Sequence, residues 1–542
     1  MFLYTKINPV LQILILFSYT SVCYSNSTGI YPIASTISAN EIVKELLAGK
    51  SVIHKNVVIK GNIVLPKNAK IIGKVEFSQC RFEGDFQSSA SMFLDLTKFE
   101  NVTFQGNVDF SGSTFHQLAV FDRTVFQGEC HFLHSMFSQL GQFTHCTFQN
   151  KVNFTSSLFD AYANFSNSTF LKPAIFSFMK TQYGAFKESK FDEAAIFYET
   201  DFVKHVDFSA VHFGNRAYFL LAKLGEERTD FIGAQFYGTA GFNGTKFGSS
   251  TNFTNAKFFQ DVNFNSEFKN VYFLWTTFNA LADFKGSKID ELLSFTETTF
   301  EKRVDLRNVK FTENSKFFIK DIRVDEMLVS WSQIEGKVGF DKWEHPSLSE
   351  IQRAYYTLYN AFMNRGQFSD ADNCYYELKE IERHMTPFWS FNYFFDYINW
   401  LFCGYGVRPY RAIKSVFIIS IFFSFIYLLS GGPLKIGNLI LKIKSFYSKQ
   451  KNKPSKYFIV GKNVSRILNA FATYFYTLLY MLGLLVCIFT RSFFLSLNVF
   501  TNFGDSYWSI DGIYRYIAVF QGTLGWFLLG LFITTYTKIL LR

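Results

Sequence analysis

The side chains that could carry out acid–base or metal chemistry form no clear constellation in this 542-residue chain. Glu382 and His384 are of types that can ligate a metal, but no second histidine lies near them, so we interpret them as part of a solvated helix face. Asp201 and Asp207 could serve as an acid and base pair, yet similar polar positions recur throughout the surrounding sequence. The seven cysteines contain no CxxC pair. The sequence therefore predicts no catalytic residue, no metal site and no cofactor, and we expect that the protein is not an enzyme.

A candidate of another kind lies near the C-terminus, between two long apolar stretches. Residues 491–510 read RSFFLSLNVFTNFGDSYWSI, which predicts a short apolar helix followed by a polar loop. The run resembles the pore helix and filter of two-span potassium-channel-like modules, whose filter reads Thr-Val-Gly-Tyr-Gly-Asp. The filter-like residues are Thr501, Asn502, Phe503, Gly504 and Asp505.

Only part of this filter-like run matches the pattern. Gly504 and Asp505 match, whereas Phe503 replaces the tyrosine, Thr501 the valine and Asn502 the first glycine. Asparagine tolerates unusual backbone angles better than most residues. The resemblance implies a degenerate pore for monovalent cations that lacks an intact potassium filter. An ordinary loop between two anchoring helices is the alternative.

Three glycines interrupt the last apolar stretch: Gly522, Gly525 and Gly530. Small residues in a membrane helix permit either close packing or bending. We therefore expect them to form a packing surface or to act as hinges of a gate.

Three apolar stretches are long enough to cross a bilayer, at residues 412–430, 467–490 and 513–537. Residues 431–466 carry nine Lys and Arg and no acid, so the positive-inside rule places this loop in the cytoplasm. The first 25 residues combine one lysine, a short apolar run and small residues, which is typical of a signal peptide; a signal anchor is the alternative. These observations predict a multi-pass cell-membrane protein with an extracytoplasmic N-terminal part and a cytoplasmic C-terminus.

Phenylalanine, of which the whole chain has 70, dominates much of the remaining sequence. Between Phe93 and Phe176, sixteen phenylalanines follow one another alternately six and five residues apart, and the residue two before each is small. In an extended chain, residues i and i−2 point to the same side. Each segment therefore sends one ring and one small group inward. The persistence of this short period predicts a solenoid with four segments and about 22 residues in each turn.

Segments such as VDFSGSTF, ANFSNSTF and AGFNGTKF resemble the pentapeptide-repeat proteins. We expect a right-handed quadrilateral β-helix of about ten turns over residues 77–320, preceded by a cap helix and first strands over residues 38–76. Cys80, Cys130 and Cys146 each stand two residues before a phenylalanine, so we expect them to be buried free thiols.

Between the repeat and the apolar stretches the period becomes helical. Residues 345–385 predict an α-helical hairpin, and the aromatic residues 387–403 favour a helix at the membrane interface, with a partly buried soluble helix as the alternative. The runs YNAFMNRGQFSDADNCYYELKEIERH and LFCGYGVRPYR resemble the segment that joins repeats to a membrane module in some membrane-bound pentapeptide-repeat proteins. An all-α transmembrane module follows.

Two functions fit these predictions. The first is an extracytoplasmic solenoid joined to an ion-channel-like module that assembles as a homotetramer in membrane lipid. The second is a surface binding or adhesion scaffold, with an unknown protein or cell-surface ligand and helices that only anchor it. From residue 77 to residue 320 there are 23 Lys and Arg against 26 Asp and Glu, so the repeat lacks the acidity that DNA mimicry requires. We expect no nucleic-acid partner.

Overall fold

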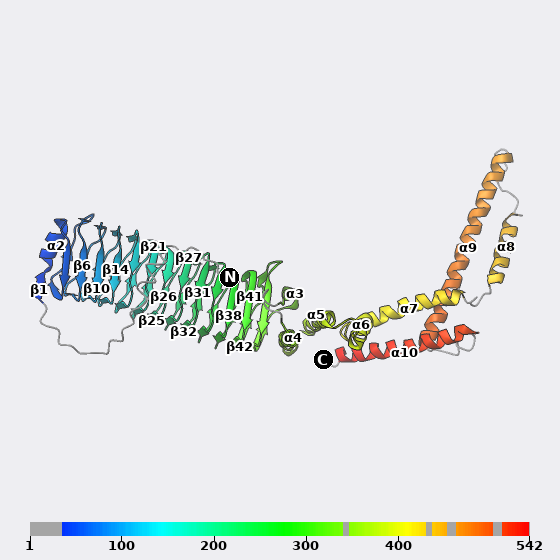
Figure 1. Ribbon diagram of the computed structural model, residues 1–542. Helices are drawn as coiled ribbons and strands as arrows, with labels where there is room; N and C mark the ends of the chain where they lie inside the picture. The colour runs from blue at the N-terminus through cyan, green and yellow to red at the C-terminus, as the bar shows by residue number, and fades with distance from the viewer. Residues whose placement is uncertain (1–34, 340–345, 430–435, 452–461, 502–511, 541–542) are drawn as a thin grey trace, which may run out of the picture. The chain divides into compact units, whose positions relative to one another are not determined.

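The computed structural model describes residues 35–339, 346–429, 436–451, 462–501 and 512–540 (Figure 1). The predicted signal peptide and four of the five filter-like residues, Asn502 to Asp505, lie outside the described residues. The chain forms two compact units, Met1–Leu293 with Thr298–Thr312 and Ser294–Glu297 with Glu313–Arg542. Each unit is described by itself.

The first unit is a parallel β-solenoid, which confirms the prediction from the phenylalanine spacing (Figure 1). One turn consists of β10 (Thr97–Glu100), β11 (Thr103–Phe104), β12 (Val108–Asp109) and β13 (Thr114–Phe115), after which β14 (Ala119–Asp122) pairs in parallel with β10. The solenoid has about 13 turns. The expected ten were too few because strands already stack before Phe77. The right-handedness and the square section stay predictions.

Several strands turn a corner without a break and so serve two faces of the solenoid. For example, β21 pairs both with β17 (Met136–Phe137) and with β18 (Leu140–Gln142). The long strands are β21 (Leu158–Asn164), β24 (Lys180–Ala185), β27 (Asp201–Asp207), β38 (Glu267–Leu274), β41 (Lys288–Thr296) and β42 (Thr299–Asp305).

The core of the solenoid is a set of stacked phenylalanine rings. Phe121 is fully buried, and its ring lies 5.2 Å from that of Phe99 in the preceding turn and 4.8 Å from that of Phe143 in the next. Ring pairs at such distances stabilise a core beyond the burial of their area. Four residues that occupy the place of a phenylalanine where the spacing continues are also buried: Thr181, Leu224, Ile289 and Leu306.

Two kinds of corner explain why the spacing alternates between five and six. The five-residue step from Phe99 to Phe104 contains Asn101 with a φ of 51°, a left-handed conformation that saves one residue at the bend. The six-residue step from Phe104 to Phe110 uses another corner, at Gly106. A Cβ atom there would lie 2.6 Å from the backbone of Gly84 one turn earlier, so only glycine fits.

Many of the small inward residues form hydrogen bonds with backbone carbonyls of a neighbouring turn, although the buried hydroxyls of Ser91, Thr97 and Thr251 have no partner among the described residues. The Thr124 hydroxyl donates to the Phe99 carbonyl at 3.0 Å, and the Ser135 hydroxyl donates to the Phe110 carbonyl at 2.8 Å. Cys146 Sγ makes the corresponding contact with the Phe121 carbonyl at 3.0 Å. Buried hydroxyls are therefore compatible with the aromatic core.

The strand registers show where the repeat slips. Most turns contain 22 residues, but Thr169 pairs with Lys190, His212 with Gln235 and Lys257 with Thr277, which gives turns of 21, 23 and 20 residues. These are the regions where the phenylalanine spacing changes.

The N-terminal end carries β1 (Ser35–Ser38) and α2 (Ala39–Leu47), whose Ile42 and Leu46 are fully buried. Ser38 is the N-cap of α2, but its side chain makes no capping hydrogen bond. As expected, Cys80, Cys130 and Cys146 are buried free thiols.

The second unit is mainly helical. After β44 (Lys316–Lys320) and β45 (Arg323–Leu328) it contains α3 (Trp331–Ile334), α4 (Leu348–Asn364), α5 (Phe368–Met385), α6 (Phe391–Cys403), α7 (Tyr410–Leu429), α8 (Ile436–Lys451), α9 (Lys462–Thr501) and α10 (Ile513–Leu540). α4 and α5 pack as a hairpin around Leu358, Phe362 and Leu378. α7, α9 and α10 contain the three stretches that are apolar and long enough to cross a membrane, as the sequence predicted.

Two features of this unit differ from the expectations. The basic segment 431–466 is not only a loop, because α8 lies within it and packs on α9, with the rings of Phe446 and Tyr480 3.9 Å apart. Residues 491–501 are helical, but they are the end of the continuous helix α9 and not a separate pore helix.

Candidate functional site

The helices α7 and α10 run antiparallel. Tyr427, near the end of α7, bonds to Gln521 in the first half of α10, whereas Ile413, near the start of α7, lines a cavity with Phe532 in the second half of α10. Cys403, which precedes α7, lines a second cavity together with Thr535 near the end of α10. The start of α7 and the end of α10 therefore lie at the same end of this helix pair.

The prediction of three helices able to cross a membrane is confirmed, whereas three complete crossings stay a prediction. An odd number of complete crossings would make the first and last membrane helices run in the same direction, so the antiparallel α7 and α10 favour two crossings. Hydropathy alone gives no direction, because it measures only the length of an apolar stretch such as that of α9. Its last residues run parallel to α10: Gln521 contacts Ser496, and Gly525 contacts Phe500.

A buried hydrogen-bond network joins the three helices. The Tyr427 hydroxyl donates to Gln521 Oε1 at 2.8 Å, and Gln521 Nε2 donates to the carbonyl and hydroxyl oxygens of Ser496 at 2.9 and 2.7 Å. All three side chains are fully buried. Such polar groups inside an apolar helix bundle hold helices in one register and mark functional regions.

Sequence reasoning missed these three residues. Gln521 is the strongest signal that was available, since it is the one amide side chain within the apolar stretch 513–537. Ser420 and Ser492 are also fully buried, and among the described residues their hydroxyl oxygens have no hydrogen-bond partner. The interior of the module is therefore more polar than its hydropathy indicates.

The filter-like run begins at this network. Thr501 is exposed at the last turn of α9, where its hydroxyl donates to the Leu497 carbonyl at 2.8 Å. The following residues, Asn502, Phe503, Gly504 and Asp505, fall outside the described residues. The structure thus places the start of the run between α7 and α10 and leaves its filter geometry a prediction.

The three glycines have different surroundings. Gly525 packs on α9 so closely that a Cβ atom would lie 2.0 Å from the Phe500 carbonyl oxygen, whereas a Cβ atom on Gly530 would meet nothing within 4 Å. Gly522 is buried. Gly525 therefore belongs to a packing surface, and Gly530 has the room that a hinge would need.

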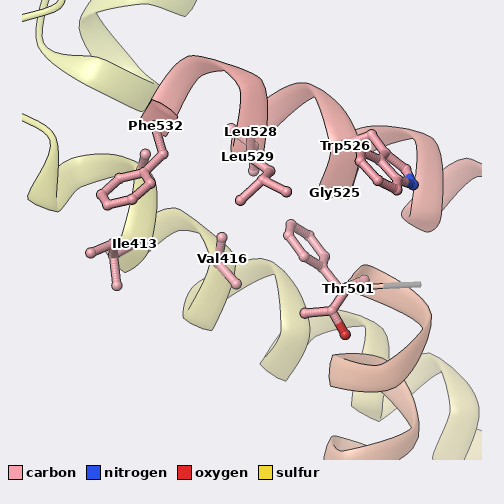
Figure 2. Close-up of a pocket in the computed structure, with 10 residues that line it drawn as sticks. Ile413, Val416, Thr501, Gly525, Trp526, Leu528, Leu529 and Phe532 are labelled. Carbon is pink, nitrogen blue, oxygen red and sulfur yellow. The ribbon is translucent and has the colours of Figure 1, made fainter. Parts of the chain in front are cut away.

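A cavity of about 320 Å³ lies beside Thr501 (Figure 2). Figure 2 shows Ile413 and Val416 of α7 on one side and Leu529 and Phe532 of α10 on the other. Its walls are almost entirely apolar, so it suits a hydrocarbon group and not a hydrated ion.

Arginine and aromatic side chains tie α5, α6 and α7 together where the candidate membrane helices begin. Arg411 donates to the Trp400 carbonyl at 2.8 Å and to the Tyr376 hydroxyl at 2.9 Å. The guanidinium of Arg383 lies 4.5 Å from the centre of the Trp400 ring. These cation–π contacts and hydrogen bonds fix α6 against the hairpin and α7.

The acidic residues considered for catalysis or metal binding are occupied by structural contacts. Asp201 lies 3.6 Å from Lys180 Nζ, Asp207 accepts a hydrogen bond from the Ser209 amide, and Glu382 bonds to Lys379. Within the described ranges no group of three or more His, Cys, Asp and Glu could hold a metal ion. The expectation that the protein is not an enzyme stays a prediction.

One ion-pair cluster on the solenoid illustrates how these acids are held. Asp230 is buried and bonds to Arg228 Nε at 2.7 Å and to His205 Nε2 at 3.1 Å. Burial alone would raise the pKa of Asp230, but the hydrogen bonds and charges of His205 and Arg228 outweigh it and lower that pKa below its usual value.

Comparison with known proteins supports the repeat alone. Residues 99–141 match the family model of pentapeptide repeats (9 copies). No curated protein and no solved structure matches the chain. The matched stretch lies within the phenylalanine-rich turns, so sequence family and fold agree there, and the helical module has no known counterpart in these comparisons.

Proposed function

We propose that the protein is a membrane-anchored pentapeptide-repeat solenoid whose C-terminal helices form a degenerate, ion-channel-like pore module for monovalent cations. One observation carries the proposal: α9 ends at Thr501 between two antiparallel apolar helices, next to the buried network of Tyr427, Ser496 and Gln521. The filter-like run continues from that point.

In the proposed assembly each chain contributes one quarter of a pore. The apolar cavity beside Thr501 cannot carry a hydrated ion, so the ion path runs along the axis of a homotetramer and is lined by the filter-like run. α7 and α10 are the two crossing helices, and the last turns of α9 enter between them.

The proposed orientation places the solenoid outside the cytoplasm. The expected signal peptide and the nine basic residues after α7 favour this side. Because α7 and α10 are antiparallel, the C-terminus then lies on the same outer side and not in the cytoplasm as the sequence alone suggested. Arg408 and Arg411 at the start of α7 weigh against this orientation.

Ion flux into vesicles tests conduction. Purified full-length protein in vesicles loaded with a potassium- or sodium-sensitive dye is expected to admit monovalent cations faster than empty vesicles. Its size in detergent, measured by light scattering, is expected to be four chains. A silent monomer would contradict the channel-like function.

The second candidate, a non-conducting binding or adhesion scaffold for a protein or cell-surface ligand, is favoured by the length of the solenoid. Replacing Asn502 to Asp505 with an inert loop separates the two. The pore proposal expects this variant to lose flux. If vesicles never conduct and a cellular phenotype survives the replacement, the scaffold is the better account.

A further inference from the structure

A polar cavity of about 330 Å³ lies among α5, α6 and α10, close to the start of α7. Its lining includes Lys379 of α5, Asp396 and Asn399 of α6, Tyr405, and Thr535 of α10. The candidate membrane helices enclose one side of it, yet its walls carry opposite charges. A cavity of this kind needs a ligand or water to satisfy its polar groups.

The Tyr405 hydroxyl is the most unusual group in this cavity. The side chain is nine-tenths buried, and among the described residues its hydroxyl has no hydrogen-bond partner. Burial and then the neighbouring charge of Glu380 raise its pKa, so the hydroxyl keeps its proton. A buried donor without an acceptor is costly and points to an acceptor supplied by a bound molecule.

The side chains of Lys379 and Asp396 indicate which charged groups the bound molecule would carry. Lys379 Nζ bonds to Glu382 and, as an ammonium, has further protons to donate. Asp396 is half-buried one turn before Trp400, and its charge acts on Tyr405. A ligand with both an anionic and a cationic group fits this pair.

The surroundings of the cavity favour a position at the boundary between water and lipid. Beside it, α6 and the residues before it expose large aromatic side chains: Trp389 is 91% and Phe391 81% exposed. Aromatic residues on an exposed helix face favour the membrane interface. The apolar cavity lined by Leu528 and Phe532 is one helical turn away along α10. In the proposed embedding it lies on the side toward the hydrocarbon.

We propose that this cavity binds the headgroup of a zwitterionic phospholipid with a primary amine. Lys379 and the Tyr405 hydroxyl donate to the phosphate, Asp396 accepts from the ammonium, and an acyl chain extends toward the apolar cavity. The site rests on the proposed embedding of the helices in membrane lipid and does not require that the module conducts.

Lipid retention by the full-length protein tests the site. Protein in detergent is mixed with phosphatidylethanolamine, phosphatidylcholine or phosphatidylglycerol, and native mass spectrometry counts the lipids bound to each chain. We expect roughly a tenfold preference for phosphatidylethanolamine over the other two, as a charge-assisted hydrogen bond to the ammonium would give. Equal retention of the three lipids would overturn the proposal.

Variants identify the groups. Asp396→Asn is expected to remove the preference for phosphatidylethanolamine over phosphatidylcholine. Tyr405→Phe is expected to weaken the binding of all three lipids several-fold. Asp325→Asn, a change at an exposed acid on β45, is the control and should behave as the parent. An unchanged preference in Asp396→Asn, or binding of inorganic phosphate alone that matches that of the lipid, would contradict the assignment.

Flotation separates failure of this site from failure of the proposed function. The protein is mixed with vesicles that lack phosphatidylethanolamine and centrifuged through a density gradient. Flotation without any lipid preference refutes only the headgroup site. Absence of flotation refutes the membrane embedding and the site together.

Discussion

Each buried phenylalanine of the solenoid has two roles. It removes its own ring from water, and it forms a platform on which the ring of the next turn stacks. Phe132 lies in the middle of such a column, 5.3 Å from Phe110 and 4.8 Å from Phe154. The column has no alternative partner for a missing ring, because the small residues around it cannot expand to fill the space.

Phe132→Ala is therefore expected to lower the free energy of unfolding by about 3–5 kcal/mol. The control is Phe178→Ala, because the Phe178 side chain is 47% exposed at a corner and its loss should change stability by about 0.5 kcal/mol or less. Denaturant unfolding followed by circular dichroism measures both. Equal effects of the two substitutions would show that the rings do not form the core.

Asp230 makes a contribution to the stability of the solenoid that depends on pH. Its pKa is lower in the folded chain than in the unfolded chain, so its stabilisation is complete above about pH 5 and is lost as the pH falls through the folded value. Asp230→Asn is expected to lower the unfolding midpoint at pH 7, and the gap between the two proteins is expected to close toward pH 2. A gap that stays constant with pH would contradict this assignment.

At the scale of elements, the contact between α9 and α10 decides whether the filter-like run is held in place. Gly525 and Gly530 form a matched pair on the same helix, one packed against the Phe500 carbonyl and one facing open space. A side chain at the first position must push the helices apart, and a side chain at the second meets nothing.

Gly525→Ala is expected to destabilise the helical module by about 1–3 kcal/mol, whereas Gly530→Ala should leave its stability unchanged or slightly raised. Thermal unfolding of the detergent-solubilised protein, followed by tryptophan fluorescence, measures the difference. The reverse order would show that α9 and α10 are not packed as described. Loss of flux in Gly530→Ala with unchanged stability would assign that glycine to a hinge.

The solenoid could be predicted from the sequence because the phenylalanines that set the repeat period are also the residues that form its core. A phenylalanine placed outside the five- and six-residue spacing between Phe93 and Phe176 would not point into the core. The spacing therefore reports the fold directly. Even the alternation of five and six has a physical origin, in the two kinds of corner at Asn101 and Gly106.

Only part of the structure of the helical module could be predicted from the sequence. Apolar length identified the three candidate membrane helices, but it carries no information on direction or partner. The antiparallel pairing of α7 with α10, the helix α8 and the network around Gln521 depend on contacts between residues far apart in the chain. No period in the sequence encodes such contacts.

At the scale of the whole molecule, the proposal that α7 and α10 both cross the membrane determines which parts of the chain share a side of it. Two antiparallel crossing helices place the start of α7 and the end of α10 on one side, and α8 on the other. Three complete crossings would separate the solenoid from the C-terminus. The two topologies therefore differ in a property that does not depend on which side is the cytoplasm.

Labelling of single cysteines in intact cells with a membrane-impermeant maleimide tests this most directly. In a background that carries Cys23→Ser and Cys487→Ser and keeps the five buried cysteines, the probes are Phe178→Cys on the solenoid, Leu441→Cys on α8 and Thr537→Cys near the end of α10, all at exposed positions. Positions 178 and 537 are expected to be either both labelled or both protected. Position 441 is expected to give the opposite result. Labelling that places 178 and 537 on opposite sides would contradict the account.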